Sequence, residues 1–184
     1  MGSFKIKYKY SNIDSLKHNI SKYPQESGPS TITSTTAFIS IIINQKLVKG
    51  SHWASERLKS SATTSGWLWY FCEDISSEVI KINDRKLHKV IPIDDPTMIT
   101  FVRENGLVNL SASAGYVPIQ TKVRYFEFMQ EIFNFVNSFV SDLITINPRI
   151  SENHEFKRIM EGRDKIKKML EEAKNVPGLK DVEK

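Results

Sequence analysis

The strongest hydrophobic pattern in the chain lies in residues 119–146. Apolar side chains recur there at intervals of three and four residues, the spacing of one helical face; they are Tyr125, Phe126, Met129, Ile132, Phe133, Val136, Phe139, Val140 and Leu143. Phe128 and Phe135 lie off this stripe, so the apolar surface extends around the helix and predicts burial between two layers. Interspersed charges such as Glu127 and Glu131 argue against a membrane span. The alternatives are a helix that binds a partner or a membrane surface, or one that lines a homodimer interface.

A second helix is predicted after Pro148, with Ser151 at its start. Its apolar positions form an amphipathic pattern over 156–173, and its other face alternates basic and acidic residues. Mixed charges at this spacing are typical of a solvated face with weak ion pairs. We expect the two helices to form a C-terminal helical hairpin.

Alternation of apolar and polar residues predicts the first strand. Phe4, Ile6, Tyr8 and Tyr10 alternate with lysines over 4–10, which indicates one buried face and one solvated row of charge. Residues 12–23 are predicted to form a short helix, capped by Ser11 or Asn12.

Three further segments are predicted to be extended. The β-branched run 37–49 indicates a buried strand that turns at Asn44-Gln45. Residues 66–72, GWLWYFC, are apolar on both alternating faces and predict a strand in the middle of a sheet, ended by Glu73-Asp74 and followed by a short helix over 78–88. Asn105-Gly106 separates 97–104 from 107–113, and this dipeptide is typical of a type I′ hairpin turn.

Together these patterns predict an α+β fold. We expect an antiparallel sheet of about five strands, including the 97–113 hairpin, packed by the C-terminal helical hairpin. Residues 1–176 are predicted to form a single domain, and residues 177–184 a flexible tail.

Composition places the chain among ordinary globular proteins. It has 184 residues, of which 40% are apolar and 26% charged. The lone cysteine, Cys72, cannot form an internal disulfide, which favours a reducing, cytoplasmic location. The net charge of +5 allows an acidic partner without requiring one.

The sequence contains no recognisable catalytic motif. Its four histidines are widely separated, and it has neither a phosphate-binding glycine loop nor a Gly-x-Ser-x-Gly elbow. A metal-dependent hydrolase is the least favoured hypothesis. It would need to hold Mg²⁺ with the carboxylates near predicted strand ends, which are Glu73, Asp74, Asp94 and Asp95. We therefore predict no cofactor, no metal and no enzymatic activity.

By elimination, the leading hypothesis is a protein-binding module that blocks a site on its partner. Its sharpest form is a bacterial immunity protein that neutralises a toxin domain. The loop at 50–65 supplies an aromatic anchor, Trp53, and acids near predicted strand ends supply charge. The predicted partner-binding residues are His52, Trp53, Glu56, Arg57, Glu73, Asp74, Asp94 and Asp95.

The alternative hypothesis is a protein that associates with nucleic acid. Basic rows on the first strand and the last helix would neutralise phosphates, while Tyr8 and Tyr10 would stack on bases. The basic residues in this hypothesis are Lys5, Lys7, Lys9, Lys157, Arg158, Lys165 and Lys168. Acidic residues interleaved on the last helix weigh against it.

Overall fold

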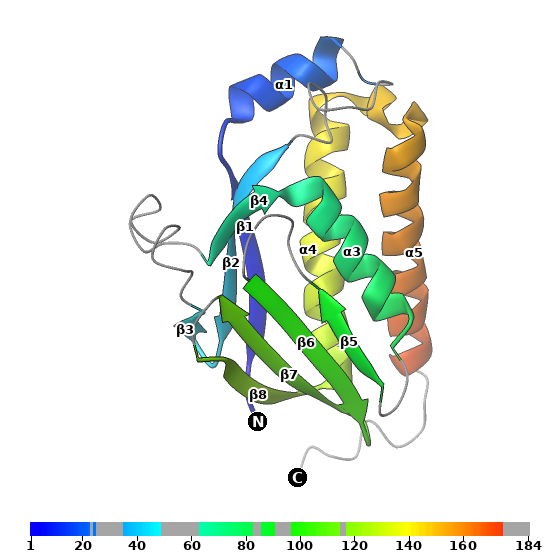
Figure 1. Ribbon diagram of the computed structural model, residues 1–184. Helices are drawn as coiled ribbons and strands as arrows, with labels where there is room; N and C mark the ends of the chain where they lie inside the picture. The colour runs from blue at the N-terminus through cyan, green and yellow to red at the C-terminus, as the bar shows by residue number, and fades with distance from the viewer. Residues whose placement is uncertain are drawn as a thin grey trace.

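The computed structural model describes residues 1–22, 24, 35–48, 63–82, 86–90, 97–114 and 117–174. Within these ranges the chain forms two antiparallel sheets and α-helices α1, α3, α4 and α5 (Figure 1). The predicted α+β class is confirmed.

The first sheet is built around strand β2 (Thr36–Ile43). Strand β1 (Phe4–Tyr10) pairs along one edge of β2, from Phe4 opposite Ile43 to Tyr10 opposite Ala37. The other edge of β2 pairs with β3 (Lys46–Leu47) at one end and with β4 (Thr64–Trp67) at the other. Asn44 and Gln45 have φ angles of 52° and 65°, so the predicted tight turn between β2 and β3 is confirmed.

The second sheet has the strand order β5-β6-β7-β8, each neighbour antiparallel. Its strands are β5 (Leu87–Val90), β6 (Thr97–Glu104), β7 (Leu107–Ala114) and β8 (Ile119–Arg124). Asn105 (φ 49°) and Gly106 (φ 77°) form the turn between β6 and β7. The hairpin predicted from this dipeptide is therefore confirmed, because both residues adopt the positive φ that the turn requires.

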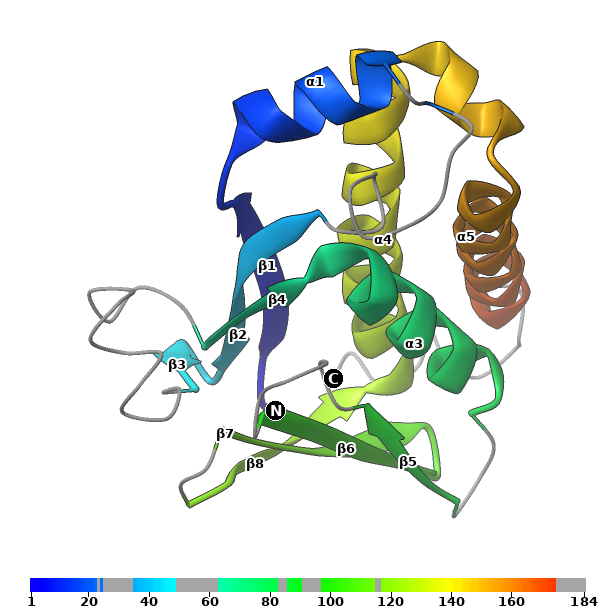
Figure 2. The same cartoon turned by 45° about the horizontal axis from the view of Figure 1, so that its top comes forward.

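The two sheets meet at an angle, and two of the helices occupy it (Figure 2). Helices α3 (Leu68–Ile80) and α4 (Tyr125–Ile146) lie inside this angle, and α5 (His154–Lys174) packs against both of them. A 3₁₀ turn, Pro148–Glu152, joins α4 to α5. Helix α1 (Ile13–Lys22) is capped by Asn12, whose Oδ1 accepts a hydrogen bond from the Ser15 N–H at 2.9 Å.

The prediction of one sheet of about five strands is wrong. Strand β4 returns to pair with β2, whereas β5 pairs with β6, so the strands divide into two sheets. The helical hairpin also differs from the prediction, because α4 packs within the angle between the sheets while α5 packs on α3 and α4. Alternation predicts which strands exist but carries no information on which strands pair.

The segment 66–72 is not a central strand. Strand β4 ends at Trp67, and helix α3 begins at Leu68 and continues through Glu73 and Asp74. The buried residues of α3 recur at helical spacing, and they are Leu68, Trp69, Phe71, Cys72, Ile75, Ser76 and Val79. A short apolar run fits the periodicity of a strand as well as that of a helix. The residues that follow it therefore determine that this segment is helical. The helix predicted over 78–88 is also wrong. Helix α3 ends at Ile80, and residues 87–90 form strand β5.

Two other helix boundaries are corrected. Residues 119–124 form strand β8, since they alternate and pair with β7, and α4 begins only at Tyr125. Helix α5 begins at His154 rather than near Ser151, because Asn153 is its cap: the Asn153 Oδ1 accepts the Phe156 N–H at 3.0 Å.

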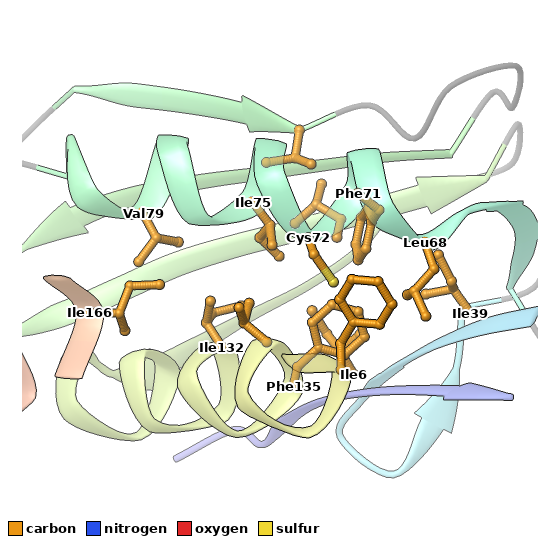
Figure 3. Close-up of a cluster of buried hydrophobic side chains, with 14 of the residues drawn as sticks. Ile6, Ile39, Leu68, Phe71, Cys72, Ile75, Val79, Ile132, Phe135 and Ile166 are labelled. Atoms are coloured by element: carbon orange, nitrogen blue, oxygen red, sulfur yellow. The ribbon is translucent and has the colours of Figure 1, made fainter. Parts of the chain in front are cut away.

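The core lies where α3 and α4 face each other and the sheets. In Figure 3, Phe71 and Ile75 of α3 point toward Ile132 and Phe135 of α4, next to Ile6 of the first sheet. The rings of Phe71 and Phe135 meet edge-on with centroids 5.5 Å apart. Most of the apolar surface of α4 is thus buried in the chain's own core. No helix in the described ranges has an apolar stretch long enough to cross a membrane.

Candidate binding surface

One face of the first sheet is turned away from α3 and α4, and we call it the outer face. Alternation along the paired strands places on it Lys5, Lys7, Lys9, Phe38, Ser40, Ile42, Leu47 and Trp67. The opposite face carries the buried side chains Phe4, Ile6, Ile39 and Ile41. Strands β1–β4 contain no Asp or Glu, so the charge of the strands on this face is entirely positive.

Three lysines form a column along β1. Lys5, Lys7 and Lys9 are exposed, and they stand opposite Ile42, Ser40 and Phe38 of β2. Alternate residues of a strand are about 7 Å apart, so the three lysine side chains leave the strand at regular intervals along the sheet edge. None of the three forms an ion pair with a residue in the described part of the chain.

Apolar side chains lie beside this column on β2 and β4. Phe38 and Ile42 are half-buried, and Trp67 is 41% exposed. Trp67 stands opposite Thr36, one pleat along from Phe38. Its ring packs on Tyr70 of α3 with the centroids 5.5 Å apart, which holds the indole at the surface. An exposed tryptophan beside a half-buried phenylalanine offers ring surface to a ligand.

The tyrosines of β1 lie on the inner side of the strand. The hydroxyls of Tyr8 and Tyr10 both donate to Asp142 Oδ2 of α4, at 2.7 and 3.0 Å. Burial raises the pKa of both tyrosines, and Asp142 adds to the effect. The predicted stacking of Tyr8 and Tyr10 on bases is therefore wrong, because both rings are turned toward α4.

Of the predicted partner-binding residues, Glu73 and Asp74 belong to the described part of the chain. His52, Trp53, Glu56, Arg57, Asp94 and Asp95 lie outside the described residues. Glu73 and Asp74 lie in helix α3 and not at a strand end, which corrects their predicted setting.

Glu73 is already engaged within the fold. Its carboxylate forms an ion pair with Arg158 of α5, which ties the two helices together. Burial raises the pKa of Glu73, and the guanidinium opposes that shift. Burial also raises the pKa of Asp74, which the nearby Glu78 reinforces.

The basic residues predicted to bind nucleic acid fall on two surfaces. Lys157, Lys165 and Lys168 are exposed on α5, which lies on the far side of α4 from β1 (Figures 1 and 2). Arg158 is paired with Glu73, and Lys168 lies 3.9 Å from Glu172. The lysine column of β1 thus lacks acidic neighbours on its own sheet, whereas the α5 set is interleaved with acids.

The described residues offer little to catalysis. They contain no cluster of three His, Cys, Asp or Glu side chains placed to hold a metal ion. Cys72 is buried, and burial raises the pKa of its thiol well above the ordinary value.

A hollow of about 310 Å³ lies between the N-terminus of β1 and the start of α4. Both of its acids already have partners: Glu131 Oε1 accepts the Ile6 N–H at 2.9 Å, and Glu127 pairs with Arg124. The hollow is lined by Gly2, Ser3, Phe4, Val123, Phe126, Glu127, Phe128, Gln130 and Glu131.

Comparison of the chain with known protein families, curated proteins and solved structures finds no match. The chain's own geometry is therefore the basis for assigning a function. On that basis the outer face is the candidate site. The alternation over 4–10 predicts its lysines, whereas Phe38, Ile42 and Trp67 were missed because their exposure depends on which strands pair.

Proposed function

We propose that the chain is a binding protein without enzymatic activity, and that the outer face of the first sheet is its contact surface. The observation that carries this proposal is the exposed Trp67 and half-buried Phe38 beside three lysines that form no ion pair within the described part of the chain, on strands without an acidic residue. A paired sheet holds the backbone that carries these side chains rigid, so little backbone freedom is lost on binding.

In the protein-binding form of this proposal, the outer face covers a site on an acidic partner. Aromatic anchors surrounded by polar groups are typical of the centre of such interfaces. Trp67 is the aromatic anchor of this interface, and the lysine column fits a partner site lined by carboxylates. A bacterial toxin-neutralising protein that blocks its toxin is the sharpest version of this form.

The proposal is tested by affinity capture from a lysate of the source organism. We expect Trp67→Ala to lose the macromolecule that the wild-type chain captures, because it removes the central anchor. Leu87→Ala is the matched control, since Leu87 is 63% exposed but lies on the second sheet. Equal loss with both variants, or no loss with Trp67→Ala, would reject the outer face as the contact surface.

Nucleic acid is the second candidate partner, and the lysine column specifically favours it. Phosphate contacts make binding steeply salt-dependent, whereas an apolar protein interface keeps its affinity at high salt. Nuclease treatment of the captured material distinguishes the two forms directly.

A further inference from the structure

We infer that the ligand of the outer face is single-stranded nucleic acid, an inference that rests on the proposed function of this face. It names the chemistry that the charges, the rings and their arrangement on the strands fit best. Each of these three features contributes a separate part of the recognition.

The charge on the face is complementary to a phosphodiester backbone. Lys5, Lys7 and Lys9 repeat along β1, and the four strands of the sheet hold no carboxylate. Glu131, an acid that reaches this strand from α4, is bound to the backbone, since its Oε1 accepts the Ile6 N–H at 2.9 Å. A regular column of like charge suits a linear polyanion better than a compact acidic patch on a protein. Lysine acts as a point charge without fixed geometry, so we expect this contact to be tolerant of sequence.

The rings of the face suit bases that are not paired. Trp67 is 41% exposed and is held by Tyr70, and Phe38 lies one pleat away on β2. A base can stack on these rings only if its own face is free, and in a duplex that face is covered by the neighbouring base pairs. The ligand is therefore a single strand.

The order of the strands places the lysine column at the edge of the sheet and the aromatic rings beside it. The lysines occupy β1 at the sheet edge, Phe38 lies on the central strand β2, and Trp67 lies on β4 beyond it. A nucleic acid backbone running along β1 would direct its bases across β2 toward β4. Charged grooves beside aromatic platforms are how sequence-tolerant single-strand binders work.

The experiment measures fluorescence anisotropy of labelled oligothymidylate and oligouridylate with the full chain over a range of salt concentrations. We expect neutralising the column, Lys5→Gln/Lys7→Gln/Lys9→Gln, to weaken binding by about tenfold at low salt and to reduce the slope of log affinity against log salt by about 2. The matched control is Lys157→Gln/Lys165→Gln/Lys168→Gln on α5, which removes the same charge from the other side of the molecule.

Trp67→Leu keeps apolar bulk against Tyr70 and removes the stacking surface, and we expect it to weaken binding by about tenfold. If this variant does not fold, as judged by circular dichroism, the exposed lysine variants still decide the question. Equal losses for the β1 and α5 variants would overturn the inference. So would the absence of binding to either oligonucleotide. If neither oligonucleotide binds but a captured protein still depends on Trp67, the outer face is a protein-binding surface; if Trp67 affects neither, the proposed function itself fails.

Discussion

At the scale of single residues, Tyr8 and Tyr10 bind the first sheet to α4 through one carboxylate oxygen. Both hydroxyls donate to Asp142 Oδ2, and Tyr8 also meets the ring of Phe135 edge-on at 5.6 Å. Ionising either tyrosine would place a second negative charge beside Asp142 in a largely buried site. The contact therefore depends on both phenols staying protonated.

This contact predicts that the protein loses stability in alkali. The pKa of each tyrosine is raised in the folded chain, so its stabilising contribution is complete below about pH 10 and is lost as the pH rises further. The raised pKa of the buried Cys72 thiol acts in the same direction from about pH 9.

Urea unfolding at pH 8 and pH 11 measures the effect. We expect the double variant Tyr8→Phe/Tyr10→Phe to lose less stability between these two pH values than the wild-type chain, although it starts lower because Asp142 has lost its donors. Identical losses in the two proteins would show that these tyrosines ionise freely in the folded state.

A second residue-scale feature is the close approach of α3 and α5 at Gly162. A Cβ added to Gly162 would lie 3.1 Å from the Cβ of Ser76, an atom whose position is fixed by the backbone of α3. The side chain of Ser76 is satisfied locally, since its hydroxyl donates to the Cys72 carbonyl at 2.6 Å. A methyl group at this position would require Ser76 and Gly162 to move apart by a few tenths of an ångström.

We therefore expect Gly162→Ala to destabilise the fold by about 1 kcal/mol, because the strain of overpacking exceeds the gain in helix propensity. Urea unfolding measures the change. Glu161→Ala, at an exposed position of the same helix, should leave stability almost unchanged. A stabilised Gly162→Ala variant would mean that α3 and α5 are not packed this closely.

At the scale of elements, the turns could be predicted from local sequence, whereas the secondary structure of the short apolar segment 66–72 could not. Asn105-Gly106 specifies its hairpin through two positive φ angles, which depend on nothing distant. Residues 68–72 are apolar on every side, so they fit a strand or a helix equally well. Helix α3 is decided by Ile75 and Val79, which continue the helical spacing beyond the acidic pair.

This correction leads to a prediction about Glu73. Proline at an interior helix position removes a backbone hydrogen bond and clashes with the preceding turn, whereas it is tolerated at a strand end. We expect Glu73→Pro to cost at least about 3 kcal/mol. Glu73→Ala should cost less than about 1 kcal/mol, because its partner Arg158 is 58% exposed. Similar melting temperatures for the two variants would contradict a helix through this residue.

At the scale of the whole molecule, α3 and α4 lie between the two sheets (Figure 2). The face of each sheet that is turned away from α3 and α4 is not covered by these helices. The sequence predicts the lysine column, because alternation within one strand fixes which side chains share a face. It could not predict that Phe38 and Trp67 join that column, since this depends on β2 pairing with both β1 and β4. Non-local pairing thus determines the candidate site as well as the fold.

The most direct test of the outer face is affinity capture with the wild-type chain, Trp67→Ala and Leu87→Ala, followed by nuclease treatment of the captured material. Our account predicts that wild type and Leu87→Ala capture the same macromolecule and that Trp67→Ala does not. Release by nuclease would identify that macromolecule as nucleic acid, and resistance to nuclease would identify it as protein. Capture by all three chains alike would contradict the assignment of the outer face as the binding surface.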